Sequence, residues 1–475
     1  MLVGRIEEQK ILAGRIASGE SELIAVYGRR RVGKTFLIRS YFKERIIFEV
    51  TGIHGASLRE QLQNFGLALQ TAMKSNVPIA TPANWIQAFH IMDQYLNGLP
   101  KSKPAVLFFD EFPWFHTQKS GFLQAFEHWW NSSASKKDHL KVIICGSAAS
   151  WMIDQVINNK GGLHNRVTQT IRLLPFTLAE TEQYLLGRGI RLSKYLILQL
   201  YMAIGGIPHY LKGIQKGESV VQAIDRLCFT KDGFLKGEFK NLYQSLFNDS
   251  HHHEEVIRAL AKNAKGLSRN EIIDECGFSS GGSTTKILNE LEESGFITPY
   301  VPFGKNEKES IYKLSDEYSL FYLKFIEHAL ATGAGTWLRQ STTASYTSWS
   351  GFAFESVCQK HVLQIKKALG IEGVFTKASS WRYKPAKGKK GAQIDLLLDR
   401  QDKVINLCEM KFTNGEFVID KKYAEELENK KAVFRSETKT RSTIFSTMIT
   451  TYGVKKNDYY RDIVDGEVLA EDLFK

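Results

Sequence analysis

The chain has 475 residues, and its 63 Lys and Arg against 51 Asp and Glu give a formal net charge of +12. This length allows two to four domains. A content of 43% hydrophobic and 24% charged residues excludes a largely disordered or collagen-like protein. The positive balance permits a polyanionic partner without proving one.

The cysteines and the N-terminal sequence indicate the compartment. The five cysteines are scattered and form no C-x-x-C pair, which excludes a disulfide scaffold and a cysteine zinc site and favours a reducing environment. The chain begins in charged sequence without a secretory signal. No apolar run reaches the about 20 residues that a membrane-spanning helix needs. We therefore expect a soluble cytoplasmic protein without a membrane partner.

The first segment, to about residue 235, alternates short apolar runs with helical patterns. Residues 22–27, 105–109 and 142–145 are continuous apolar stretches, typical of strands buried on both faces of a parallel sheet. Helical patterns between such strands predict an α/β fold in which helices cover the sheet.

A phosphate-binding loop follows the first of these strands. Residues 28–35 fit G-x-x-x-x-G-K-[ST] in full, and residues 36–38 open a helix. In such a loop, backbone N–H groups surround phosphates, Lys34 reaches the β- and γ-phosphates of ATP, and the Thr35 hydroxyl is a ligand for Mg²⁺. The alternative is a glycine turn that happens to end in Lys-Thr. The residues expected to bind the nucleotide here are Gly28, Arg29, Arg30, Arg31, Val32, Gly33, Lys34 and Thr35.

An acidic pair ends the second strand. Asp110 and Glu111 lie at its carboxyl end, where open α/β sheets place their ligands. We expect Asp110 to hold Mg²⁺ through water, and Glu111 to orient or deprotonate the attacking water. The alternative is that the pair merely caps a helix.

Three motifs resemble one family. Residues 3–8 (Val-Gly-Arg-x-x-Glu), the loop 27–35 and residues 205–211 (Gly-Gly-Ile-Pro-His-Tyr-Leu) are similar to the prokaryotic "archaeal-type" AAA+/STAND-like ATPases, which often carry a C-terminal domain called DUF234. The resemblance implies that Ser147 is a sensor beside the γ-phosphate. It also implies that Arg166 stabilises transition-state charge, within its own subunit or across the interface of a homo-oligomer. The alternatives are a strand-ending turn and a surface arginine.

The Gly-Gly-Ile-Pro turn at residues 205–208 is expected to be architectural. We interpret it as a hinge between the parallel sheet and a helical lid.

The middle region, residues 236–330, predicts a winged helix-turn-helix. A capping box at 268–271 starts a short helix that ends at Gly277, and Ser283 is expected to cap a helix over 284–294 that Gly295 ends. Two strands, 296–301 and 310–314, and a helix over 316–331 complete the expected order.

This region is expected to read DNA poorly. The helix at 284–294 offers Lys286 and Asn289 to bases, but it also carries three carboxylates that repel a polyanion, and Glu307 offsets the lysines of the wing. We expect a packing or partner-protein contact instead. The carboxylates on the helix are Glu290, Glu292 and Glu293, and the wing lysines are Lys305 and Lys308.

A carboxylate pattern marks the last segment, which follows a predicted linker at 331–351 rich in Ala, Thr, Ser and Gly. Residues 393–398 and 407–411 predict a hairpin around a loop at 399–403. On a strand, alternate residues share a face, so Glu409 and Lys411 project together, and Asp395 of the neighbouring strand can meet them. The alternative is an amphipathic hairpin with exposed charges.

The arrangement resembles the PD-(D/E)XK nuclease core. Asp395 matches the D, Glu409 to Lys411 match the ExK, and Glu355 matches the upstream acidic residue; Ile394 stands where the name-giving proline is expected. The resemblance implies that Asp395 and Glu409 bind Mg²⁺ and that Lys411 and Glu355 are catalytic. The basic stretch 382–390 is expected to contact a phosphate backbone.

These observations combine into one prediction. The fold class is α/β: a P-loop ATPase domain with a helical lid (1–235), a winged helix-turn-helix (236–330), a linker (331–351) and a restriction-endonuclease-like domain (352–475). The expected cofactors are ATP and Mg²⁺, and the expected partner is DNA, bound without sequence specificity. The predicted function is ATP-driven action on DNA with phosphodiester cleavage at the C-terminal site. The alternative is a nucleotide-driven switch that binds DNA or protein and cuts nothing.

Overall fold

The computed structural model describes residues 2–100, 102–158, 161–247, 249–279, 281–329, 333–383 and 391–475. The chain folds into two compact units, Met1–Leu174 and Pro175–Lys475. Residues 175–235, which were predicted to form part of the ATPase domain with its helical lid, therefore belong to the second unit. Across the described ranges, no helix combines the length and apolar character needed to cross a bilayer.

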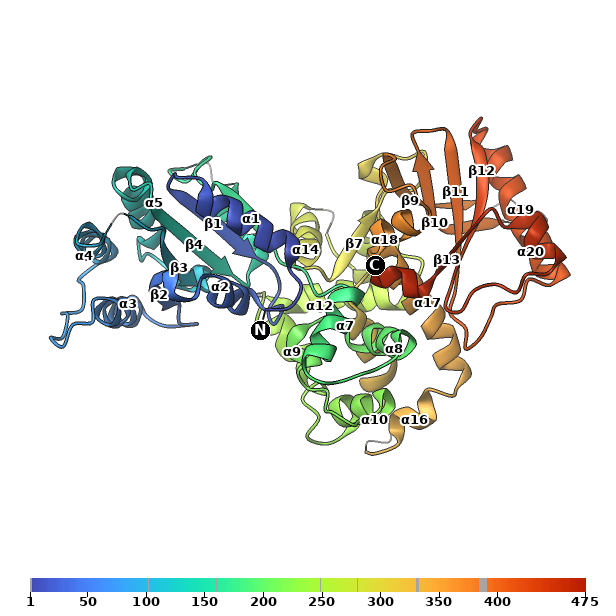
Figure 1. The fold of residues 1–475 in the computed structure, drawn as a ribbon, viewed down its shortest axis with the longest axis horizontal. Helices are drawn as coiled ribbons and strands as arrows, with labels where there is room; N and C mark the ends of the chain where they lie inside the picture. Colours follow the sequence, from blue (N-terminus) through green and yellow to red (C-terminus); the bar gives the residue numbers. More distant parts are fainter. Residues whose placement is uncertain are drawn as a thin grey trace. The chain divides into compact units, whose positions relative to one another are not determined.

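The first unit is built on a five-stranded parallel sheet with the strand order β2-β3-β4-β1-β5 (Figure 1). The three predicted strands are confirmed as β1, β3 and β4, which are buried along nearly their whole length because the sheet is covered. The strands are β1 (Glu22–Tyr27), β2 (Ile46–Thr51), β3 (Ala105–Asp110), β4 (Leu140–Gly146) and β5 (Gln169–Arg172).

An aromatic core lies between this sheet and the helices α3, α4 and α5. Phe89 of α4 stacks on Trp129 of α5 at a centroid distance of 5.1 Å, and the Trp85 and Phe122 rings meet edge to face at 4.7 Å. Such pairs fix the helices on one face of the sheet. The helices of this unit are α1 (Ile6–Ala17), α2 (Lys34–Phe42), α3 (Leu58–Ala72), α4 (Trp85–Asn97), α5 (Phe122–Ser132) and α6 (Ala149–Met152).

The second unit begins with short helices that are held by the Gly205-Gly206 turn. Phe176 N–H donates to the Gly206 carbonyl at 2.7 Å, and a Cβ on Gly206 would lie 2.0 Å from the Phe176 carbonyl oxygen. Gly205 itself has φ +66°. Only glycine permits this close approach, which supports the expected architectural role. The helices are α7 (Leu178–Gly187), α8 (Lys194–Ile204), α9 (Pro208–Leu211), α10 (Val220–Ile224) and α11 (Glu238–Gln244).

After α11, the middle region continues with the predicted order of three helices and a hairpin, and the capping box at Ser268 is confirmed. The prediction for Ser283 was wrong: extended Gly281 precedes the helix, which begins at Gly282, so Ser283 lies in its first turn and does not cap it. The elements are α12 (Ser250–Lys262), β6 (Leu267–Ser268), α13 (Arg269–Cys276), α14 (Gly282–Glu293), β7 (Ile297–Tyr300), β8 (Ile311–Leu314), α15 (Glu317–Phe321) and the π-helical turn η7 (Tyr322–Ile326).

The segment predicted as a linker is largely helical. It carries α16 (Thr336–Gln340) and the start of α17 (Ala344–Lys360). Trp337 and Trp349 explain why, because their rings pack on Phe321 at centroid distances of 4.8 and 5.5 Å and are buried. Asp225 also accepts the backbone N–H of Trp337 at 2.6 Å. The Ala/Ser/Thr content of the segment had suggested a loop, but its two tryptophans bury it.

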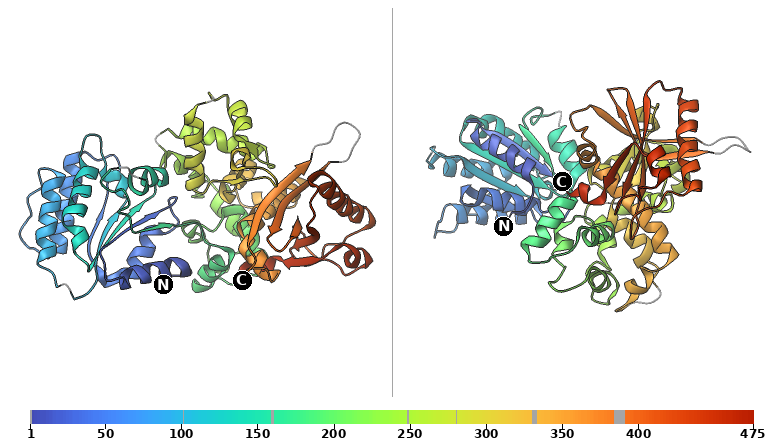
Figure 2. Two further views of the ribbon diagram at one scale, coloured as in Figure 1. Left: turned by 90° about the horizontal axis from the view of Figure 1, so that it is seen from above. Right: turned by 45° about the vertical axis from the view of Figure 1, so that its right-hand side comes forward.

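The C-terminal sheet is mixed, with the order β13-β12-β11-β10-β9. The predicted hairpin is confirmed as the antiparallel pair β10–β11, and β12 then joins β11 in parallel. Figure 2 shows α19 beside this sheet. The elements are α18 (Val362–Ala368), β9 (Thr376–Tyr383), β10 (Ala392–Arg400), β11 (Val404–Lys411), α19 (Lys421–Thr438), β12 (Thr443–Thr450), α20 (Asp458–Ile463) and β13 (Gly466–Leu469).

Buried polar contacts join the parts of the second unit. Lys360 at the end of α17 donates to Glu317 of α15 at 2.5 Å; the Glu317 side chain is buried, whereas that of Lys360 is 25% exposed. Burial raises the pKa of Glu317 although this ammonium lies beside it. His361 accepts the Leu178 N–H at 3.2 Å through Nε2, and its Nδ1 lies 2.8 Å from the Val357 carbonyl. These contacts tie α7, α15 and α17 together.

Candidate functional site

The phosphate loop lies between β1 and α2. Lys34 is buried, and its ammonium donates to the carbonyl oxygens of Gly28 and Arg29 at 2.8 and 2.9 Å. Burial lowers the pKa of Lys34. Gly28 has φ +143°, and a Cβ there would lie 2.3 Å from the Leu173 carbonyl oxygen, so the loop requires glycine at this position.

A hydroxyl–carboxylate pair stands at the end of the loop. The Thr35 hydroxyl donates to Asp110 at 2.9 Å, which joins the start of α2 to the end of β3. Burial raises the pKa of Asp110, while the Thr35 hydrogen bond acts against it. A hydroxyl and a carboxylate in contact are suitable oxygen ligands for the Mg²⁺ that accompanies ATP, so the residues fit this ion.

Glu111 and Ser147 form a second pair in the same unit. Glu111 accepts both the hydroxyl and the backbone N–H of Ser147, at 2.7 and 3.1 Å. Its backbone is left-handed, with φ +46°, which is uncommon outside glycine and frequent at functional sites. The structure therefore brings together a base and a sensor candidate that the sequence places 36 residues apart.

The loop arginines have different environments. Arg29 is buried, Arg31 is exposed, and Arg30 lies over the Trp114 ring at 5.9 Å. Val32 is buried, and its carbonyl accepts a hydrogen bond from Arg5 at 3.2 Å.

Arg5 is itself the arginine of the N-terminal motif and lies 3.7 Å from Glu8. That motif thus supports the phosphate loop. Arg166, by contrast, is exposed in a turn, where its N–H donates to the Leu163 carbonyl at 2.9 Å.

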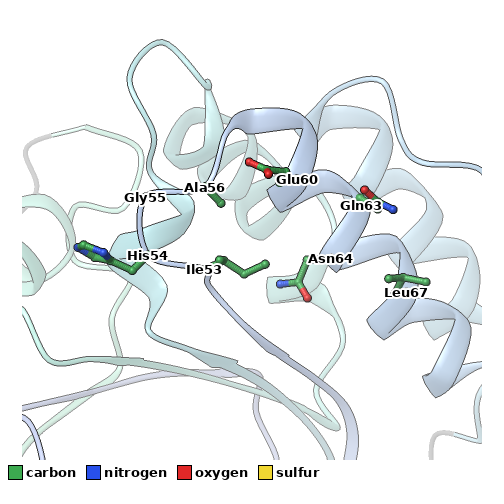
Figure 3. Close-up of a pocket in the computed structure, with 8 residues that line it drawn as sticks. All are labelled: Ile53, His54, Gly55, Ala56, Glu60, Gln63, Asn64 and Leu67. Carbon is green, nitrogen blue, oxygen red and sulfur yellow. The ribbon is translucent and has the colours of Figure 1, made fainter.

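A cavity of about 440 Å³ opens beside the loop that follows β2. Residues 53–56 line one side, and Glu60, Asn64 and Leu67 of α3 line the other (Figure 3). The His54 ring meets Trp114 edge to face at 5.3 Å, so this loop contacts the same tryptophan as Arg30. The sequence analysis did not single out this cavity.

The helix α14 is less acidic toward solvent than its sequence suggests. Glu290 is half-buried and lies 2.7 Å from Nε2 of His253, whose ring stacks on Phe247. Lys286 and Asn289 are exposed. The contact with His253 therefore reduces the repulsion of DNA that was expected from Glu290. Glu292 and Glu293 on the same helix are also half-buried.

At the C-terminal site, Glu409 has cationic and hydroxyl partners. It lies 3.0 Å from the Lys411 ammonium, as the strand alternation predicts. Lys430 and the Tyr423 hydroxyl of α19 also donate to it, at 2.7 and 2.8 Å. Burial acts to raise the pKa of Glu409, but the Lys430 and Lys411 ammonium groups outweigh it, so the pKa lies below its usual value.

Asp395 and Glu409 lie close enough to Glu355 to act on its carboxyl group electrostatically. Burial and the Asp395 carboxylate raise the pKa of Glu355 to about 8, with a smaller contribution from Glu409. A β-bulge between Ile394 and Leu397 interrupts the alternation around Asp395, because both flanking side chains enter one apolar cluster. Asp395 itself accepts from the Gln393 amide at 2.6 Å.

The carboxylates of this site are not drawn into one tight group. Among the described residues, one group of three side chains has its possible metal-ligating atoms all within 4.8 Å of one another. It consists of His251, His252 and Glu255 and does not include these carboxylates. The basic stretch predicted at 382–390 falls mostly on residues 384–390, which lie outside the described residues; Arg382 is exposed on β9.

Sequence reasoning missed Tyr423 and Lys430. They are seven residues apart, which places them two turns apart on one face of α19. That spacing was visible in the sequence, but only the packing of α19 on the sheet shows that this face meets Glu409.

Family comparisons cover two parts of the chain. Residues 2–214 match an ATPase domain found predominantly in Archaea. Residues 322–432 match DUF234, a family of archaeal and bacterial proteins of unknown function. The second match begins within η7, upstream of the C-terminal domain predicted from the sequence.

Several individual proteins are similar over longer stretches. The uncharacterized protein MJECL04 of Methanocaldococcus jannaschii is 25% identical over 416 residues, covering 87% of this chain and 88% of its own length. The Walker-type ATPase PABY2304 of Pyrococcus abyssi is 19% identical, with a TM-score of 0.49, and the similarity covers 68% of this chain and 96% of that one. The ORC2 protein of Aeropyrum pernix is 13% identical, with a TM-score of 0.38, covering 72% and 96%. The chain is thus a P-loop ATPase that carries an ATPase domain of the predominantly archaeal type, followed by a DUF234 domain.

Proposed function

We propose that this ATPase uses ATP to act on DNA and that its C-terminal site cleaves phosphodiester bonds with Mg²⁺. One observation carries the proposal: acidic side chains from α17, β10 and β11 lie close enough for Asp395 and Glu409 to raise the pKa of Glu355, with Lys411 beside them. Carboxylates that disfavour one another's charge are stabilised by a divalent cation.

The residues fit Mg²⁺ by their chemistry, since carboxylate oxygens are the ligands that this ion prefers. Asp395 and Glu409 would hold the ion, which supplies a polarised phosphate and a more acidic water. Lys411 would stabilise the developing phosphorane charge, and Glu355 would orient the attacking water. Cation binding at Glu409 requires Lys430 to move away from that carboxylate.

In the ATPase domain, the proposed roles follow the contacts of each residue. Thr35 and Asp110 hold Mg²⁺, and Lys34 exchanges the loop carbonyls for the β- and γ-phosphates. Glu111 activates the attacking water and Ser147 positions Glu111 through its two hydrogen bonds. Arg166 is exposed and therefore available to a neighbouring subunit.

A second function is favoured by the state of Glu409. Two lysines and a tyrosine hold this carboxylate, as in a binding module that has lost a metal site. In that case, ATP would drive a switch that binds DNA or protein and cuts nothing.

One experiment separates the two functions. Full-length protein is incubated with supercoiled plasmid and with single-stranded DNA, with and without ATP, in Mg²⁺ or Mn²⁺. We expect nicking that disappears in Asp395→Ala while ATP hydrolysis continues. DNA binding without any metal-dependent nicking would contradict cleavage and leave the switch.

A further inference from the structure

A cavity of about 580 Å³ lies in the second unit, where residues of α12, of α15 with η7, and of α17 meet. This volume is in the range of sites that enclose a nucleotide-sized ligand. Its apolar wall is formed by Leu320, Leu323, Trp349 and Phe352. No residue of α14, the helix expected to enter DNA in a winged helix, lines it.

The side chains that line this cavity carry a net positive charge. Arg258 is neutralised by Glu327 through two hydrogen bonds of 2.6 and 2.7 Å. Lys262 and Lys324 also line the cavity and are exposed, and neither makes a salt bridge within the part of the chain that the structure describes. Two unpaired ammonium groups beside an apolar wall fit an anion that also has a flat apolar part.

Aromatic side chains supply the surface for such a flat group. Phe352 is 42% exposed and forms part of the cavity wall. Trp349 is only 5% exposed, and its indole N–H has no acceptor within the described residues. A buried donor without a partner at the wall of a cavity favours a ligand that brings an acceptor.

A much smaller space separates this cavity from the C-terminal carboxylates. A second cavity, of about 30 Å³, shares Ala264, Leu320 and Phe352 with the first. Its wall also includes Lys313 and Glu355. A ligand on Phe352 therefore lies beside the helix face that carries Glu355.

We infer that this cavity binds single-stranded DNA beside the C-terminal site. A base stacks on Phe352, and the backbone phosphates lie on Lys262 and Lys324. The inference rests on the proposed function, because it names the form of DNA that the same site receives. Base stacking with cationic backbone contacts binds single strands without reading sequence.

The test measures the affinity of the full chain for a labelled oligothymidylate and for a duplex of equal length, with EDTA to prevent cleavage. Phe352→Ala is expected to weaken binding of the single strand about tenfold. Lys262→Ala with Lys324→Ala is expected to flatten the salt slope by about 1.4, because two phosphate contacts are lost. Phe375→Ala, at a ring that is 75% exposed on the same unit, is the matched control and should change nothing.

A second readout locates the strand. Irradiation of an oligonucleotide with 5-iodouracil is expected to crosslink the peptide that contains Phe352. Circular dichroism melting of each variant shows whether it is folded. Lys262 and Lys324 are exposed, so their substitution does not disturb the hydrophobic core.

Each outcome decides between the inference and the function on which it rests. Unchanged affinity of both variants for the single strand overturns the inference; this is the result expected if the cavity holds an apolar peptide instead. Metal-dependent nicking by the wild type would still support the proposed function. Weaker single-strand binding in the variants, without any nicking by the wild type, supports the inference and contradicts cleavage. If the wild type binds neither form of DNA, both are wrong.

Discussion

The nucleotide site and the C-terminal site both combine carboxylates with a lysine, but they hold these groups differently. In the ATPase domain, Asp110 and Glu111 are hydrogen-bonded to the hydroxyls of Thr35 and Ser147. In the C-terminal domain, Glu409 is held by the Lys411 and Lys430 ammonium groups. A neutral hydroxyl leaves the negative charge available to a cation, whereas two ammonium groups neutralise it.

This difference in hydrogen-bond and ion-pair partners leads us to expect different responses of the two sites to a cation. At the nucleotide site, no ammonium group forms a salt bridge with Asp110 or Glu111 within the described residues, so a cation that accompanies ATP would meet the hydroxyl partners of these carboxylates. At the C-terminal site, a cation that binds Glu409 would compete with the existing ion pair to Lys430. We therefore expect Lys430 to lower the affinity of the proposed metal site, although it contributes no ligand.

The largest effect is expected from Glu111→Gln. The amide cannot accept the proton of the attacking water, so ATP hydrolysis is expected to fall by about 10²- to 10⁴-fold. ATP affinity should stay the same, because the phosphate contacts are made by other residues. Phosphate release and nucleotide affinity are measured together, with Ser147→Ala as a milder companion. Full hydrolysis by the glutamine variant would remove Glu111 from the mechanism.

Lys34→Ala tests the other half of the nucleotide site. Loss of the ammonium that faces the β- and γ-phosphates is expected to weaken ATP binding about 100-fold. Equilibrium dialysis or calorimetry with a non-hydrolysable ATP analogue measures the change. Near-normal affinity would mean that the buried ammonium stays on the Gly28 and Arg29 carbonyls when nucleotide binds.

The C-terminal site is tested by a pair of opposite changes. Asp395→Ala is expected to lower Mn²⁺ affinity about tenfold or more, whereas Lys430→Ala should raise it, because Glu409 loses a competing cation. Calorimetry with Mn²⁺ on the full chain, with the nucleotide site saturated beforehand by Mg²⁺ and an ATP analogue, reports both. Equal affinities in the two variants would contradict competition at Glu409.

The smallest effect concerns how the second unit is held together. Burial lowers the pKa of His361 to about 4, so the folded state keeps this imidazole neutral while the unfolded chain takes up a proton near its usual pKa of 6.5. The unfolded state thus binds more protons between these values, and stability is expected to fall as pH decreases from about 6.5 toward 4. Thermal melts should lose a few degrees over this range. In His361→Gln, which does not titrate, that part of the pH dependence should be absent.

Local sequence was sufficient for the nucleotide site and insufficient elsewhere. The loop at 28–35 is continuous, and Asp110 and Glu111 follow a buried strand, so spacing alone places them at one edge of a sheet. The hairpin of β10 and β11 is also local. The bulge at Asp395 could not be predicted from the local sequence. It depends on which side chains enter the apolar cluster under α19.

Contacts between distant segments account for the other differences. Residues 336–351 are largely helical because Trp337 and Trp349 pack on Phe321. The small polar residues of this segment gave no sign of this packing. In the same way, His253 meets Glu290 from another helix, so the charge of α14 cannot be judged from that helix alone.

The ion pair between Lys360 and Glu317 bears on how this chain can be divided. The two residues lie on either side of the predicted linker, so any cut between them leaves a buried carboxylate without its counter-charge. Removing one member of such a pair costs about 3–5 kcal/mol. This is comparable to the whole stability margin of a small domain. A fragment that starts after the linker would therefore be a poor measure of the C-terminal site, and chimaeras should exchange α15 and α17 as one piece.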